Sequence, residues 1–258
     1  MDYKFIIAEI KEQFGIIVLN RTDKLNALTD EDVKKLISAL QELEQSREVR
    51  VVIIKANGKA FCSGHDFNEI LAKKTTVEHR MWIGAANFQE VMHMMTKPVI
   101  AVVHGYVAAG GISIVSACDL VIASEETRFS TPGINFGLAC MLPAAEASKW
   151  MFKRKALQLL LTGESIDAHT AERIGLINEV VPREKLDEVA LDMARRIAEK
   201  SPLAIKLAKE SFYTASDMEL NKMMVYLRDV MAINAGSEDA REGIMSFIEK
   251  RSAYWKGC

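Results

Sequence analysis

The sequence predicts an α/β fold that is rich in strands in its first half and rich in helices in its second. Two observations lead to this prediction. Short runs of apolar, β-branched residues such as "VRVVIIKA" and "PVIAVVHG" recur early in the chain and are typical of buried strands. From Ala144 onward, longer segments place apolar residues at helical spacing. With 258 residues, the chain is long enough to bury a sizeable core.

In the first half, "KFIIAEI" and "GIIVLN" predict two strands joined near Glu12 to Phe14. The segment "TDEDVKKLISALQELEQS" predicts a helix that Thr29 or Asp30 caps. After the strand "VRVVIIKA", the glycines of "NGKAFCSGHDF" break the pattern, and "VEHRMWIGAANFQEVMHMMTK" predicts a helix ended by the Lys97-Pro98 step. Then follow a strand "PVIAVVHG", a turn "GYVAAGGIS" into a short helix, strands "DLVIAS" and "RFST", and a loop "PGINFGLACMLP".

The second half is predicted to be almost entirely helical. Helices are expected in "AAEASKWMF", "KALQLLL", "DAHTAERIG", "REKLDEVALDMARRIAEK", "LAIKLAKESFY", "MELNKMMVYLRDVMAINA" and "SEDAREGIMSFIEKR". Only "INEVV" is expected to interrupt them as a strand. No linker or low-complexity tract divides the chain.

Charge and cysteine usage narrow the function classes. The chain has 33 Lys plus Arg against 35 Asp plus Glu, which argues against a broad nucleic-acid surface. The four cysteines are widely spaced without a C-x-x-C pair, so we expect neither a zinc site nor a redox motif. Neither a signal peptide nor a run of roughly 18 apolar residues is expected to direct the chain to a membrane. These features favour a cytoplasmic protein with no membrane partner.

Two loops share one plan, a strand followed by a glycine-bearing turn and a helical or polar start. They are "VVIIKANGKAFCSGHDF" and "PVIAVVHGYVAAGGIS". Amides at such a turn can bind a phosphate or a developing oxyanion. Neither loop has the G-x-x-x-x-G-K-[ST] or G-x-G-x-x-G pattern of nucleotide-binding loops. The alternatives are a paired oxyanion hole, with one amide from each loop, or glycines that serve only tight turns and close packing.

The motifs in their order resemble the crotonase (enoyl-CoA hydratase/isomerase) superfamily. The resemblance spans nearly the whole chain, through "LNRTDKLNALT", "FCSGHDFNEI", "PVIAVVHGYVAAGGISIVSACDLVIASEETRFSTPGINFG", "AERIGLINEVVP" and "EGIMSFIEKRSAYW". It implies a spiral of β-β-α turns over residues 1–195, which carries the acyl-CoA site. It also implies a helical C-terminal trimerisation region over 196–258, with the chain forming a homotrimer or a hexamer built as a dimer of trimers.

The resemblance also implies an enzyme that stabilises a thioester enolate. The backbone amides of His65 and Gly110 match the family's oxyanion hole. The substrate supplies coenzyme A, and no further cofactor or metal is implied. The matching substrate-binding positions are Lys24, Ser63, Asp66, Phe67, Asn68, Phe247 and Lys250. Phe247 and Lys250 match positions that reach the CoA of a neighbouring subunit. For the lysines the alternative is an ordinary surface role, and for Asp66 it is capping of its own turn.

Ser113 and Gly133 stand where the family's hydratases place two glutamates. Hydration by a glutamate pair is therefore not expected of this chain. The pattern "SGHDF … AAGG … STPGINFGLAC" most resembles the enoyl-CoA hydratase domain-containing subgroup, which also lacks both glutamates. Glu146 is read as a solvated helix acid and Cys140 as an apolar filler. The alternative function is a non-catalytic CoA-thioester binding protein; RNA binding ranks low because the first predicted helix is acid-balanced. A further set of residues either shapes the acyl pocket or belongs to the core: Met81, Trp82, Phe88, Met92 and the loop 138–142.

Overall fold

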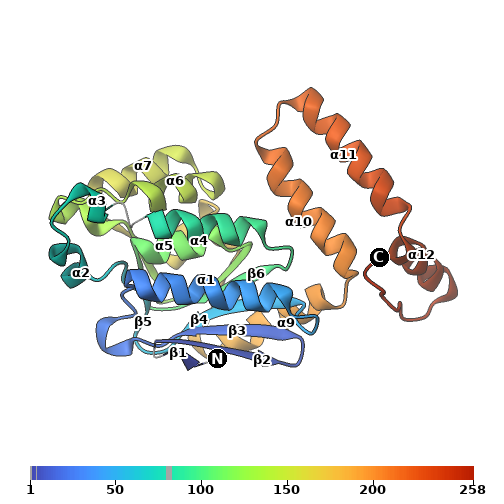
Figure 1. Cartoon of the computed structure of the whole chain (residues 1–258), viewed down its shortest axis with the longest axis horizontal. Coiled ribbons are helices and arrows are strands. Elements are labelled where there is room, and N and C mark those ends of the chain that lie inside the picture. Colours follow the sequence, from blue (N-terminus) through green and yellow to red (C-terminus); the bar gives the residue numbers. More distant parts are fainter. Residues whose placement is uncertain (1, 4, 80–82) are drawn as a thin grey trace.

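A seven-stranded sheet forms the centre of the computed structural model, which describes residues 2–3, 5–79 and 83–258 (Figure 1). The strands lie in the order β1-β2-β3-β4-β6-β8-β11. From β3 to β11 they run parallel, while β1 and β2 are antiparallel at one edge. Their bounds are Asp2–Tyr3 (β1), Ile6–Lys11 (β2), Phe14–Leu19 (β3), Val51–Ala56 (β4), Val99–Val103 (β6), Leu120–Ser124 (β8) and Glu179–Val181 (β11).

A second sheet of four short strands has the order β10-β9-β7-β5. Its strands are Ala60–Cys62 (β5), Tyr106–Ala108 (β7), Arg128–Ser130 (β9) and Ser165–Asp167 (β10). Strands β5, β7 and β9 each follow one long parallel strand of the first sheet, namely β4, β6 and β8. Each turn of the chain therefore adds one strand to both sheets before a helix follows. This arrangement confirms the spiral of β-β-α turns that the family resemblance implies.

Helices cover both faces of the large sheet. One core unites α1 (Asp30–Gln45), α4 (Ile83–Met94) and α5 (Gly110–Ala117) with inward side chains of the sheet such as Ile17 and Ile54. The opposite face, including Ile16 and Ile53, packs against α9 (Leu186–Ala198). All residues of β3 and β6 are buried, as expected for parallel strands covered on both sides. Further helices are α2 (Phe67–Ala72), α3 (Thr76–His79), α6 (Met141–Trp150), α7 (Lys153–Thr162) and α8 (Ala168–Arg173), with the 3-10 turns η1 (Thr22–Lys24), η3 (Pro132–Phe136) and η4 (Arg183–Lys185).

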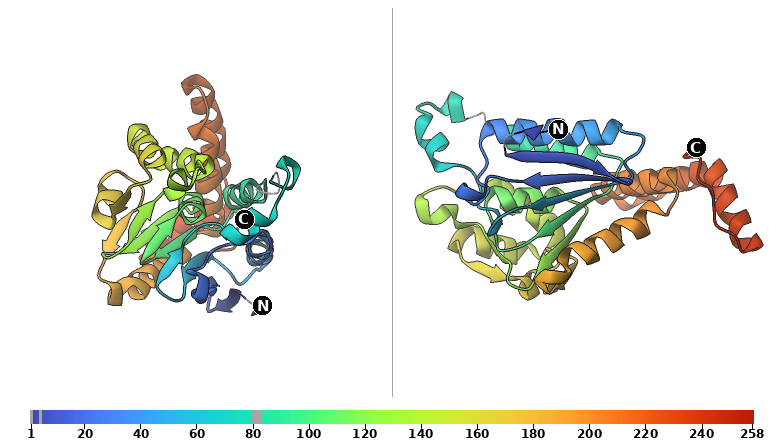
Figure 2. Two further views of the ribbon diagram at one scale, coloured as in Figure 1. Left: turned by 90° about the vertical axis from the view of Figure 1, so that its left-hand side faces the viewer. Right: turned by 90° about the horizontal axis from the view of Figure 1, so that it is seen from below.

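Three C-terminal helices extend away from the sheets (Figures 1 and 2). They are α10 (Pro202–Ser216), α11 (Leu220–Ala235) and α12 (Glu238–Glu249). Their exposed large apolar side chains include Phe212, Leu220, Met224, Val225, Met231, Ile233, Ile244, Met245, Phe247 and Ile248. The proposed division at residues 195/196 falls inside α9, which packs on the sheet, so the helices that stand apart begin only at α10.

Most expected elements are confirmed, and the differences concern short ones. Thr29 caps α1 in a reciprocal capping box with Asp32. The predicted helix "VEHRMWIGAANFQEVMHMMTK" covers α4 and all of α3 except its first residue, with residues 80–82 between them outside the described chain. The expectation of a single strand in the second half is wrong, because Ser165–Asp167 pairs with β9 as strand β10. Three residues are too few to show the alternation that indicates a strand.

Candidate functional site

An apolar cavity of about 250 Å³ opens between the second sheet, α2 and the segment around η3. Its lining residues are Ser63, His65, Phe67, Ile70, Ala109, Gly110, Ser113, Pro132, Gly133, Phe136, Leu138, Ala139, Cys140, Met141, Leu142 and Pro143. Within the described chain, this lining contains no carboxylate. The cavity therefore suits an apolar ligand and offers few polar groups for chemistry.

The two glycine loops meet at this cavity. One loop follows β5 and contains Gly64 and His65, and the other follows β7 and contains Ala109 and Gly110. Because β5 and β7 are neighbouring parallel strands, both loops leave the same edge of the sheet. A Cβ built on Gly64 would lie 2.9 Å from the Cβ of Ala109 and 3.5 Å from the Gly110 nitrogen. Glycine at position 64 is therefore needed for this close approach.

The hydrogen bonds of the first loop determine where the His65 amide points. Leu28 donates its N–H to the Gly64 carbonyl at 2.8 Å, and Asp66 donates its N–H to the Leu28 carbonyl at 2.9 Å. A trans peptide places its C=O and N–H on opposite sides. Since the Gly64 carbonyl faces Leu28, the N–H of His65 points away from Leu28.

The second loop directs the Gly110 amide in the same way. The Ala109 carbonyl accepts the N–H groups of Ile112 and Ser113 at 2.9 and 3.3 Å, and so points along α5. The Gly110 N–H then points out of the helix start, and no backbone carbonyl of the described residues outside the helix accepts it. Ala109 holds this turn with φ 47° and ψ −109°, a strained conformation for a residue with a Cβ, and its own N–H bonds to the Ser130 carbonyl at 3.1 Å.

The His65 side chain also belongs to this site. A Cβ built on Gly110 would lie 3.3 Å from both Nδ1 and Cε1 of the imidazole. Burial lowers the pKa of His65; the charge of Asp30 raises it and that of Lys73 lowers it further. The ring is therefore a neutral imidazole at pH 7.

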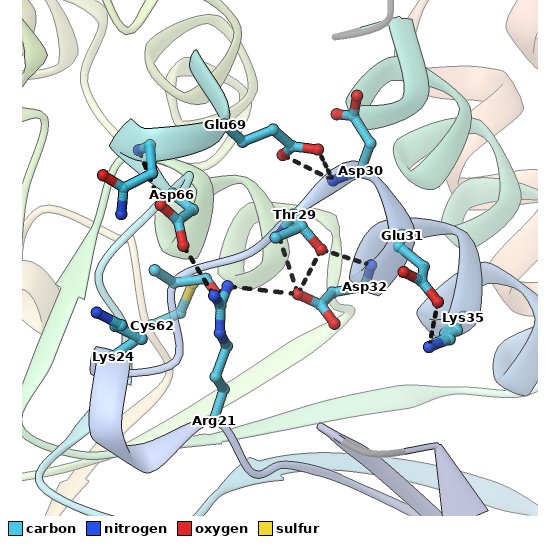
Figure 3. A network of polar contacts seen from close by, with 12 residues as sticks. Arg21, Lys24, Thr29, Asp30, Glu31, Asp32, Lys35, Cys62, Asp66 and Glu69 are labelled. Atoms are coloured by element: carbon cyan, nitrogen blue, oxygen red, sulfur yellow. Dashed lines mark hydrogen bonds and ion pairs between the residues drawn. The ribbon is translucent and has the colours of Figure 1, made fainter. Parts of the chain in front are cut away.

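A polar network supports the first loop from below (Figure 3). Asp66 caps α2 by accepting the Asn68 N–H at 2.9 Å, and it pairs with the Arg21 guanidinium at 2.8 Å. Burial raises the pKa of Asp66, but the Asn68 amide and Arg21 lower it more, so the net shift is downward. Arg21 also lies 3.8 Å from Asp32 of the α1 capping box. These partners give Asp66 the capping role that the sequence offered as its alternative.

A second pair of contacts ties α2 to the start of α1, and Figure 3 shows the one between Glu69 and Asp30. Glu69 accepts the backbone N–H of Asp30 at 3.0 Å, and Lys73 pairs with the Asp30 carboxylate at 2.6 Å. Both side chains of the Lys73–Asp30 pair are largely buried. The helix that covers one side of the cavity is therefore fastened to the core by charged groups.

Ser113 and Gly133, the positions that the family resemblance matches to two glutamates, both line the cavity. Ser113 is buried in α5. Gly133 has no room for a side chain, because a Cβ there would lie 2.7 Å from Cys140 Sγ and collide with the Leu138 carbonyl. Leu138 closes this turn by donating its N–H to the Gly133 carbonyl at 2.9 Å. Replacement of Gly133 by glutamate would therefore require this turn to change its conformation.

The remaining predicted positions do not all lie at the cavity. Ser63 and Phe67 line the cavity, while Lys24 is exposed in η1 and its carbonyl accepts the Ser63 hydroxyl at 3.4 Å. Asn68 is exposed on α2. Phe247 lies on α12 and Lys250 directly follows this helix, at the opposite end of the molecule from α2 (Figures 1 and 2). Within one chain, these two residues do not join the cavity.

Sequence reasoning missed the environment of Glu146. This residue is not a solvated first-turn acid, because its side chain is largely buried in the middle of α6, 3.5 Å from His93 Nε2. The hydrogen bond to His93 lowers the pKa of Glu146. Phe88 and Met92 are buried in the core, Met81 and Trp82 lie outside the described residues, and the loop 138–142 lines the cavity. Among the described residues, no three metal-binding side chains cluster and no helix is long and apolar enough to cross a membrane.

Comparison with known proteins agrees with this geometry. The family model described as enoyl-CoA hydratase/isomerase matches residues 9–258. The chain is 35% identical over 254 residues to "Enoyl-CoA hydratase domain-containing protein 3, mitochondrial" of Rattus norvegicus, covering 96% of this chain and 84% of that protein. It is 34% identical over 253 residues to "Probable enoyl-CoA hydratase echA8" of Mycobacterium tuberculosis, covering 98% of both. The crystal structure of human enoyl Coenzyme A hydratase domain-containing protein 3 superposes with a TM-score of 0.95 at 32% identity, covering 98% of this chain and 100% of that one.

The double-sheet spiral and the two convergent glycine loops define a protein of the crotonase class. The chain belongs to the enoyl-CoA hydratase/isomerase family. The expectation of a cytoplasmic protein is contradicted by its relatives, since the vertebrate proteins that it matches are named as mitochondrial. The composition could not have predicted the compartment, because charge balance and cysteine spacing do not distinguish the cytoplasm from the mitochondrion.

Proposed function

We propose that this chain binds an acyl-CoA in the apolar cavity and stabilises the enolate of its thioester. The proposal is supported by the two glycine loops, which lie together and line that cavity; from their hydrogen bonds we infer that the amides of His65 and Gly110 point toward one oxygen there. The carbonyl of each of these two peptide groups is held by hydrogen bonds, which fixes the direction of its N–H. Amides fixed in this way need no reorganisation as negative charge builds on the thioester oxygen. The start of α5 adds its positive end to the same place.

The coenzyme part of the substrate is proposed to lie across the rim formed by Lys24, Ser63 and Phe67. Lys24 would meet the nucleotide phosphates as a point charge. Phe247 and Lys250 would contribute from a neighbouring copy, because in their own chain they lie far from the cavity. The proposal requires no cofactor beyond the coenzyme A of the substrate.

Hydration by two glutamates is not part of this proposal, because Ser113 and Gly133 occupy the two positions. We expect purified protein to bind butyryl-CoA in calorimetry and to hydrate crotonyl-CoA slowly or not at all. The matched control is an alkyl-CoA thioether of the same length, which lacks the carbonyl oxygen. Loss of two hydrogen bonds predicts that the thioether binds at least about tenfold more weakly. Equal affinity for thioester and thioether would contradict the proposal that two amides bind the carbonyl oxygen. Hydration of crotonyl-CoA at a rate usual for a hydratase would contradict the expectation that hydration needs the two glutamates.

The second candidate is a CoA-thioester binding protein without catalysis. The absence of carboxylates from the described cavity lining favours it. It predicts the same butyryl-CoA affinity but no turnover and no proton exchange with any acyl-CoA of a broad panel. Conversion of one thioester by the native chain would exclude it.

A further inference from the structure

The imidazole of His65 stands beside the place where the amides would hold a thioester oxygen. His65 lines the cavity, and its ring edge approaches the backbone of Gly110, with Nδ1 and Cε1 both 3.3 Å from a Cβ built there. The ring is therefore a neighbour of both amides, one of which belongs to its own residue. The carbon next to the thioester carbonyl would lie within the same few ångströms.

Few groups in this cavity can accept a proton. The polar side chains of its described lining are those of His65, Ser63, Ser113 and Cys140. A serine hydroxyl has no useful basicity near pH 7. Burial raises the pKa of the Cys140 thiol, so this group keeps its proton. An imidazole in its neutral form is the remaining base of suitable strength.

Burial, rather than the two nearby charges, lowers the pKa of the His65 ring. The charges of Asp30 in α1 and Lys73 after α2 also act on the pKa of His65, and these two residues pair with each other at 2.6 Å. Their opposite effects on the imidazole partly cancel, so that burial determines the direction of the shift. The pKa of His65 is therefore below its ordinary value of about 6.5.

We propose that His65 is a catalytic base, which removes and returns the α-proton of the bound acyl-CoA. This inference rests on the proposed function and deepens it. A lone pair of the imidazole forms the new N–H bond as the Cα–H bond breaks. The released electron pair forms a Cα–C double bond, and the carbonyl pair moves to the oxygen held by the two amides. Return of the proton to Cα gives exchange with solvent.

A single base of this kind defines the reaction class. With a 3-enoyl-CoA, the imidazolium can return the proton to Cγ while the double bond moves to the 2-position, which needs no further reactant. Addition of water would require a second group to activate it, and the described cavity lining offers none. Isomerisation and α-proton exchange, rather than hydration, are the chemistry that this cavity supports.

The test compares the native chain with His65→Gln, which keeps the backbone amide and an amide side chain but cannot act as this base. Butyryl-CoA is incubated in deuterated water, deuterium at Cα is followed by mass spectrometry, and binding is measured by calorimetry. We expect His65→Gln to bind within threefold of the native chain while exchange falls by about 100-fold or more. His169→Gln, on the exposed face of α8, is the control and should exchange like the native protein.

Two further readouts separate a base from a structural residue. Native exchange should fall as the pH drops through the lowered pKa of the imidazole, at a midpoint below about 6.5. Added imidazole should restore exchange to His65→Ala. Undiminished exchange by His65→Gln would overturn the inference and leave the proposed function intact. Native protein that binds butyryl-CoA without any exchange would overturn it too, and protein that binds no acyl-CoA would overturn the proposed function itself.

Discussion

At Gly111, α5 lies close against strand β5 of the second sheet. A Cβ built on it would lie 2.6 Å from the Cys62 carbonyl oxygen, which belongs to the backbone of β5 and cannot rotate away. Alanine in a helix is normally favoured over glycine by about 1 kcal/mol. Here we expect Gly111→Ala instead to lower the free energy of unfolding by about 1–3 kcal/mol through overpacking.

Urea unfolding checks this expectation, with Gly236→Ala as the control. At Gly236 the nearest atoms lie 3.5 and 3.7 Å from a built Cβ, which is ordinary contact, and φ is −82°. That substitution should be neutral or stabilise the chain by up to about 1 kcal/mol. Equal stability of the Gly111→Ala and native chains would show that α5 can shift away from β5.

Asp66 gives the site a pH-dependent support. Its folded pKa lies below that of the unfolded chain, so its pairing with Arg21 stabilises the fold above about pH 4 and is lost as the pH falls through the folded pKa. We expect Asp66→Asn to lower the free energy of unfolding at pH 7 by about 1–3 kcal/mol. The difference from the native chain should narrow as the pH falls below about 4.

Urea titrations at pH 7 and at points down to about pH 3.5 test this dependence. Asp187→Asn is the matched control, because Asp187 forms an exposed pair with Lys55 at 3.2 Å. An exposed pair of this kind contributes at most about 1 kcal/mol. A stability difference for Asp66→Asn that stays constant with pH would argue that capping of α2, rather than charge, is its role.

Single residues also show what the sequence can and cannot reveal about the site. The order of motifs pointed to His65 and Gly110, and the structure brings their loops together although 45 positions separate them. The imidazole beside Gly110 and the crowding at Gly133 could not be predicted. Both depend on contacts shorter than 4 Å. The contact at Gly110 joins two loops that are far apart in the sequence, and the contacts at Gly133 form within one turn. The residue types alone do not determine such distances.

Among the elements, α2 and η3 meet across the mouth of the cavity. Phe67 and Phe136 stack edge to face with ring centroids 5.4 Å apart, and both line the cavity. Such a pair contributes about 0.5–1.5 kcal/mol beyond its buried area. On the proposed function, we expect Phe136→Ala to weaken butyryl-CoA binding by about 2–10-fold, because α2 is then held less firmly over the acyl chain.

Calorimetry measures this change, and Phe152→Ala serves as control. Phe152 is also an exposed phenylalanine, but it precedes α7 and does not line the cavity. An unchanged dissociation constant for Phe136→Ala would mean that the stack closes no part of the acyl site.

The elements that the sequence predicted are those with a strong pattern. Helix α1 shows its cap at Thr29 and its apolar positions, and β4 and β6 are rich in β-branched residues. Strands β5, β7, β9 and β10 have three residues each, and only β9 was expected as a separate strand. Their pairing with one another, rather than their own composition, makes them strands.

The whole molecule combines a double-sheet body with three helices that extend away from it (Figure 1). These helices leave large apolar side chains exposed. Exposed apolar patches on a soluble protein mark interaction surfaces. Phe247, with 85% of its surface exposed, is the clearest example. The sequence predicts helices in this region. It does not predict which helix faces lack a partner, because this depends on how α10 to α12 extend from the body.

We expect this region to join copies of the chain into a trimer or hexamer. Sedimentation should then give a mass of three or six times the 28.8 kDa of one chain. The double substitution Met224→Lys and Met231→Lys should shift the mass toward one chain, because it places charges on two side chains that are 59% and 70% exposed on α11. Glu164→Lys, exposed on the body, is the control and should leave the mass unchanged. The assembly should also matter for ligand binding. Since Phe247 and Lys250 cannot reach the cavity of their own chain, dissociation of the oligomer into single chains should weaken butyryl-CoA binding. A native chain that sediments as a monomer and still binds butyryl-CoA would contradict both expectations.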